Sequence, residues 1–116
     1  MFIDILTFTQ ANLEAISGTA LEVTDREYTH ESLTTRYRPT EITMKNISGD
    51  TIEFCPFTAN EYVQYLADPT ISDLMTLANS ASKTLTSLKG EITQVLAKEI
   101  SGATLTSGAV CTIIQQ

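Results

Sequence analysis

Two alternating apolar runs separated by a short polar turn constrain the fold more than any other feature of this sequence. Four large apolar residues lie at alternate positions of these runs: Ile42, Met44, Ile52 and Phe54. Side chains alternate between the two faces of a strand, so these residues meet within one sheet only if paired residue numbers sum to an even value. A three-residue turn, Ser48–Asp50, satisfies this condition. The sequence therefore predicts a β-hairpin over residues 41–55, with Met44 opposite Phe54.

The two ends of the chain also read as strands. Met1–Phe8 is mostly apolar on both alternating faces, with Asp4 as the exception, and Val110–Ile114 has the same character. This pattern is typical of a strand that is covered on both faces. We therefore expect both segments in the middle of the sheet, and a further strand over Thr19–Thr24, where apolar residues alternate.

Helix-start signals predict the helical part of the fold. Thr9 can cap a short helix that ends before Gly18, and Thr58 forms a capping box with Glu61. Asp68-Pro69 is typical of another helix start. These signals predict helices over about 58–67 and 69–88, and a last one over 91–101.

Apolar residues between Ile71 and Val95 are spaced alternately by three and four, as in a heptad repeat. One continuous helix would leave part of this seam beyond a compact domain, where a second chain could cover it. A break at Gly90 is the favoured alternative, because threonine and glycine are weak helix formers. The predicted interface residues on this seam are Leu85, Leu88 and Ile92.

Together these elements predict a single α+β domain over residues 1–116. We expect a four- to five-stranded, mostly antiparallel sheet with the helices packed on one face. Residues 24–41 are polar, with Leu33 as their one aliphatic residue, and we expect them to form an exposed loop or arm.

Charge narrows the range of partners. The chain of 116 residues has a formal net charge of -7. An acidic surface repels phosphate backbones and anionic lipid, which argues against direct nucleic-acid or membrane binding. Met1–Phe8 lacks the basic region of a signal peptide, so we expect a cytoplasmic or virion protein that is not secreted. Cys55 and Cys111 are then expected to be free thiols.

The sequence contains no recognised catalytic or phosphate-binding motif. His30 is expected to be a solvated loop residue rather than a catalytic one. The oxygen-rich segment around it, which includes Asp25 and Glu31, lacks the spacing of a calcium loop, so we expect no metal and no cofactor. The candidate ligand-binding residues are Arg36, Tyr37, Arg38 and His30, because two guanidinium groups on one strand face can hold a phosphate. The alternative is that these arginines pair with the chain's own acids.

We therefore expect a non-enzymatic assembly or interaction protein that acts as a homo-oligomer. A phage or virus structural or accessory subunit would suit a short, threonine-rich chain without motifs. Two alternatives remain open. The chain could be an acidic inhibitor that blocks a basic groove, or a small module that binds a phosphate or nucleotide ligand.

Overall fold

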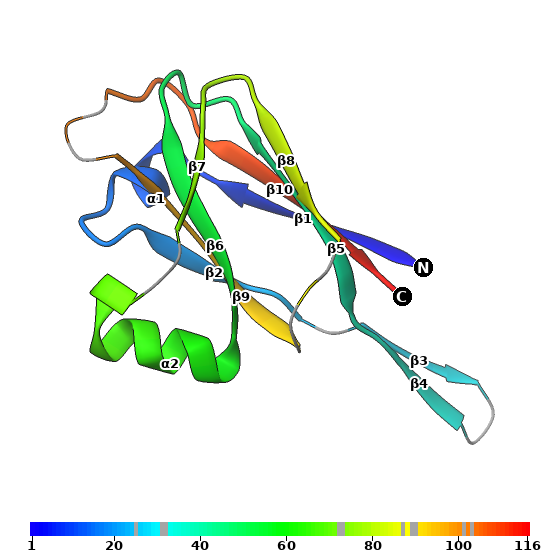
Figure 1. Cartoon of the computed structure of the whole chain (residues 1–116). Coiled ribbons are helices and arrows are strands. Elements are labelled where there is room, and N and C mark those ends of the chain that lie inside the picture. The colour runs from blue at the N-terminus through cyan, green and yellow to red at the C-terminus, as the bar shows by residue number, and fades with distance from the viewer. Residues whose placement is uncertain are drawn as a thin grey trace.

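The computed structural model describes residues 1–24, 26–30, 33–71, 74–86, 88, 91–100, 102 and 104–116. Within them the chain forms two four-stranded antiparallel sheets that pack face to face, and two short helices (Figure 1). Sheet A has the order β1 (Phe2–Phe8), β10 (Ala109–Gln115), β5 (Pro39–Asn46), β8 (Ser82–Leu85). Sheet B has the order β2 (Thr19–Glu22), β9 (Ile92–Glu99), β6 (Ile52–Thr58), β7 (Met75–Leu77). The remaining elements are α1 (Gln10–Glu14), α2 (Ala59–Ala67), the 3-10 turn Pro69–Ile71, and a separate hairpin of β3 (Arg26–His30) and β4 (Leu33–Tyr37).

The main core lies between the two sheets. Sheet A contributes Met44 and Ile113 and sheet B contributes Phe54 and Val95, all without exposed surface. Leu13 of α1 belongs to the same cluster. The chain is thus mostly β, and α+β only in the broad sense.

The predicted hairpin over residues 41–55 is wrong, although both of its strands exist. β5 pairs with β10 and β8, whereas β6 pairs with β9 and β7, so the turn between them crosses from one sheet to the other. Met44 lies beside Cys111 and Lys83 in sheet A, and Phe54 lies in sheet B. Alternation shows which face of a strand is buried. It does not show whether another apolar strand pairs with it in the same sheet or packs against it from the opposite sheet.

The predicted helices over 69–88 and 91–101 are also wrong. The described residues of these segments contain a single 3-10 turn and the strands β7, β8 and β9. Threonine and other β-branched residues favour strands, and polar turns between short strands reproduced the three-four apolar spacing by chance. At one such turn Ser80 adopts a left-handed conformation, with φ of 67°, which ends any helical path.

The two early helices match their predictions. Thr9 and Thr58 each form a capping box, with Asn12 and Glu61 respectively. α2 covers the outer face of sheet B, where Tyr65 packs in a second buried cluster with Phe57 and Leu96. The predicted covering of one sheet face by helices therefore holds for α2 only.

The predictions for the two terminal strands had different outcomes. β10 lies inside sheet A between β1 and β5, as predicted. β1 is an edge strand instead, and its outer face carries Ile3 and Ile5 with 56% and 64% of their surface exposed. The strand whose pattern predicts cover on both faces is therefore covered on one.

Candidate interaction surfaces

The hairpin β3–β4 forms an arm that projects from the two-sheet body (Figure 1). Its strands pair with each other in a regular antiparallel register from Arg26↔Tyr37 to His30↔Leu33. The molecule measures 53 × 30 × 23 Å, and its radius of gyration is 14.8 Å. A compact chain of this length would have a radius of about 13 Å. The arm therefore makes the molecule longer than a compact domain of the same size.

The root of the arm is attached to sheet A. Arg38 and Gln116 exchange backbone hydrogen bonds of 3.1 and 3.0 Å. The ring of Tyr37 meets that of Phe2 edge to face, with 4.7 Å between ring centroids. Because both contacts lie beside β1, the arm starts at the N-terminal end of this edge strand.

Both arginines that were predicted to bind a ligand form ion pairs with acidic side chains of the same chain. Arg36 pairs with Glu27 at 3.7 Å, and Arg38 forms an ion pair with Glu91. Tyr37 contacts Phe2, and His30 lies in β3 near the arm tip, where its side chain is outside the described part of the structure.

Arg36 lines a shallow depression at the arm root, of about 610 Å³. Three carboxylate side chains line it too: Glu22, Glu27 and Glu91. One guanidinium among three carboxylates leaves the depression negative, which disfavours a phosphate ligand. This arrangement agrees with charge pairing inside the chain, the alternative interpretation of these arginines.

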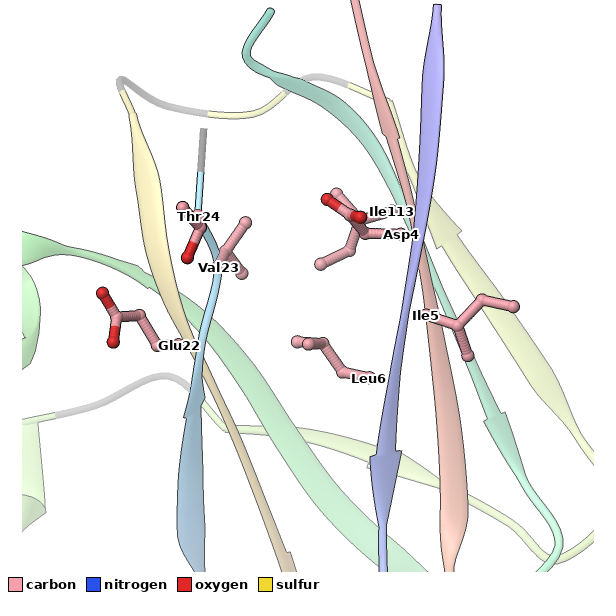
Figure 2. Close-up of a pocket in the computed structure, with 7 residues that line it drawn as sticks. All are labelled: Asp4, Ile5, Leu6, Glu22, Val23, Thr24 and Ile113. Atoms are coloured by element: carbon pink, nitrogen blue, oxygen red, sulfur yellow. The ribbon is translucent and has the colours of Figure 1, made fainter. Parts of the chain in front are cut away.

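A groove of about 430 Å³ lies where the edges of the two sheets meet (Figure 2). Asp4, Leu6 and Ile113 point from sheet A toward Val23 and Thr24, whereas Ile5 points to the outside (Figure 2).

The buried side chain of Gln115 links the two sides of this groove. Its Nε2 atom donates to Asp4 Oδ2 at 2.5 Å and to the backbone carbonyl of Thr24 at 3.1 Å. The single charged side chain of β1 is therefore engaged inside the molecule.

The outer face of β1 is exposed, whereas the sequence predicted that both faces of this strand would be covered. Ile3 and Ile5 lie on the outer face of sheet A, beside Ile114 and Thr112 of β10. The signal was present, because the strand is apolar on both faces. The prediction assigned the cover of both faces to other parts of the same chain.

The predicted interface residues lie in or against the core. Ile92 has 3% of its surface exposed, and Leu85 and Leu88 pack against the main cluster. The helical seam that motivated this prediction does not exist, since Leu85 and Ile92 belong to strands β8 and β9.

Both cysteines are free thiols. Cys111 lies in the core between the sheets, and burial raises the pKa of its thiol to about 12. Cys55 packs against the second cluster, beneath α2. A thiol that stays protonated is a weak nucleophile, so Cys111 has the properties of a structural residue.

Among the described residues, no group of three histidine, cysteine or acidic side chains is arranged to hold a metal ion. Asp25 and Glu31, which the sequence placed in the oxygen-rich segment, lie outside that set. In the same part of the chain, no helix combines the length and apolar character needed to cross a membrane.

Comparison with known proteins gave no match to any family model, curated protein or solved structure.

Proposed function

We propose that this chain is a non-enzymatic assembly subunit that works as a homo-oligomer and uses the β3–β4 arm to reach a neighbouring copy. The observation that carries the proposal is the arm itself, a paired hairpin that extends from the two-sheet body (Figure 1). An isolated two-stranded hairpin is at best marginally stable in water. A neighbouring subunit would supply the missing cover.

The arm tip supports a contact role. Leu33, the first residue of β4, has 72% of its surface exposed. At the opposite end, the arm root is held by the Arg38–Gln116 backbone pair. An anchored root and an exposed leucine beside the tip suit a segment that docks on another protein. A particle subunit of a phage or virus is one setting in which such an arm would serve.

Co-purification of two differently tagged copies tests the proposal. Capture of one tag should retain the other copy in wild-type protein. Leu33→Asp should lower the retained fraction, because the tip would then bring a charge to an apolar contact. Thr34→Asp, at the neighbouring exposed position, is the matched control for added charge. Wild-type copies that never retain one another would contradict the proposal.

The acidic inhibitor is the second candidate, and the net charge of -7 favours it. An acidic surface would bind a basic protein through charge, so this binding would weaken steeply with salt. An inhibitor of this kind needs no second copy of itself. The co-purification result therefore separates the two candidates.

A further inference from the structure

We infer that strand β1 pairs with β1 of a second copy, antiparallel and about a two-fold axis at Ile5, so that two four-stranded sheets join into one of eight strands. This inference rests on the proposed homo-oligomeric function and names one of its contact surfaces. It concerns the edge of sheet A, whereas the arm is a separate element that starts beside it.

The first observation is the contrast among the four sheet edges in the described part of the chain. An exposed strand edge is a template for pairing, and proteins protect such edges by keeping them short or by placing charge on them. β7 has three residues, β2 has four including Glu22, and β8 has four including Lys83. β1 has seven residues, its one charge, Asp4, is held on the inner side by Gln115, and all seven pair with β10 without a register shift. It is the one long, regular edge of these four.

The second observation is the apolar outer face of β1. Ile3 and Ile5 are more than half exposed, and Ile114 of the neighbouring strand extends the same surface. The sequence of β1 has the pattern of a strand covered on both faces, yet this chain covers one. Local sequence that disagrees with its own fold is expected at functional sites. Pairing with a second sheet would bring the outer face of β1 beside another apolar row.

The third observation concerns register and charge. In an antiparallel pair about a two-fold axis, inner residues meet inner residues only when the axis passes through a residue. An axis at Asp4 would place two carboxylates directly opposite each other, which is destabilising. An axis at Ile5 places Asp4 opposite Leu6 of the partner subunit. It also pairs Phe2 with the partner's Phe8, so the full seven residues overlap.

The distribution of charge allows the partner at this edge to be a second copy. Each chain carries a net charge of -7, so two copies repel over most of their surface. β1 carries one charge, because Asp4 is its one charged residue, and that carboxylate accepts a hydrogen bond from Gln115 on the inner side of the sheet. The edge therefore allows approach where repulsion is weakest, and its register is self-complementary.

Disulfide trapping tests the register. An axis at Ile5 brings the two copies of residue 5 within about 4.5–5.5 Å, Cα to Cα, a distance that a disulfide spans. Ile5→Cys should therefore give a covalent dimer under mild oxidation. Ile3→Cys is the matched control, since its two copies would be about 14 Å apart along the strands at roughly 3.4 Å per residue. Wild-type protein, with Cys55 and Cys111 alone, sets the background.

A charge variant tests the contact without new thiols. Ile5→Lys would place two ammonium groups opposite each other at the axis, and should weaken self-association by about tenfold or more, the equivalent of about 1.4 kcal/mol. Ile16→Lys makes the same change at a fully exposed position outside the strands and should have no effect. At a concentration low enough for all chains to be monomeric, both variants should melt like wild type, because Ile5 is 64% exposed and Ile16 is fully exposed.

The outcomes separate this inference from the proposed function. Wild-type protein that oligomerises while Ile5→Lys associates equally well, or Ile5→Cys that does not cross-link above background, would overturn the β1 contact and leave the assembly role standing. Preferential cross-linking of Ile3→Cys would overturn the register. Wild-type protein that stays monomeric would overturn the assembly role, and this inference with it.

Discussion

At the scale of single residues, Asn46 fixes the crossing between the two sheets. Its amide donates to the carbonyls of Asp50 at 2.7 Å and Leu77 at 2.9 Å. Its Oδ1 atom accepts from the backbone and the hydroxyl of Ser48 at 2.9 and 2.6 Å. The side chain is fully buried, and so are the bonds to Leu77 and Ser48, whereas the bond to Asp50 is partly buried. Asn46 is the last residue of β5, and nothing in the sequence around it distinguishes it from an ordinary turn asparagine.

Asn46→Ala should therefore lower the free energy of unfolding by about 3 kcal/mol, because several buried polar groups would lose their partner. Asn79→Ala is the control. Its Oδ1 atom accepts one exposed bond from Gly49, and its loss should cost less than about 1 kcal/mol. Urea denaturation of both variants measures the difference. Equal losses would mean that Asn46 does not hold the crossing.

The buried thiol of Cys111 makes stability depend on alkaline pH. Its pKa is raised to about 12 in the folded chain, against 9.0 for an ordinary thiol. Above about pH 9 the unfolded chain releases this proton while the folded chain retains it. The contribution of the thiol to stability is therefore complete below pH 9 and declines as pH rises toward 12.

Comparison with Cys111→Ala isolates this contribution. The difference in unfolding free energy between wild type and variant should shrink by about 1.4 kcal/mol per pH unit above pH 9, and stay constant below it. Chemical denaturation at several pH values measures both. A difference that stays constant across the whole range would show that the thiol ionises equally in both states.

At the scale of elements, sequence pattern predicted local structure better than the pairing of strands. The cap at Thr9 and the capping box at Thr58 located both short helices, because a cap depends on residues two or three apart in the chain. The alternation around Met44 correctly identified the buried face of β5. It could not identify the partner strand, since β10 lies more than sixty residues away along the chain. The same limit applies to the outer face of β1. An apolar face has the same sequence pattern whether it is covered by its own chain or by another chain.

Cysteine pairs test the observed arrangement of β5 against the predicted hairpin. Lys45 is directly opposite Ser82 of β8, so Lys45→Cys with Ser82→Cys should form a disulfide within one chain. Lys45→Cys with Glu53→Cys should not, because residue 53 belongs to sheet B, about 10 Å away across the core. The hairpin would have placed residues 45 and 53 opposite each other. Mass spectrometry of peptides from oxidised protein identifies the linked pairs, and a 45–53 link would contradict the two-sheet fold.

At the scale of the whole molecule, charge predicts how self-association responds to salt. Two copies at -7 each repel, and the proposed contact at β1 adds one carboxylate per copy and no opposite charge within the strand. Raising ionic strength from about 0.01 M to about 1 M shortens the screening length from about 30 Å to about 3 Å. Self-association should therefore become tighter with salt. An acidic inhibitor would show the opposite trend toward its basic partner, so sedimentation at several salt concentrations distinguishes the two functions.

The central claim is that this chain works as a homo-oligomer, and its mass in solution tests that claim most directly. Light scattering across a concentration series, at moderate salt, gives the mass without any label or variant. We predict that the mass rises with concentration from 12.7 kDa to a multiple of that value. A constant mass of 12.7 kDa at the highest concentration would contradict the account.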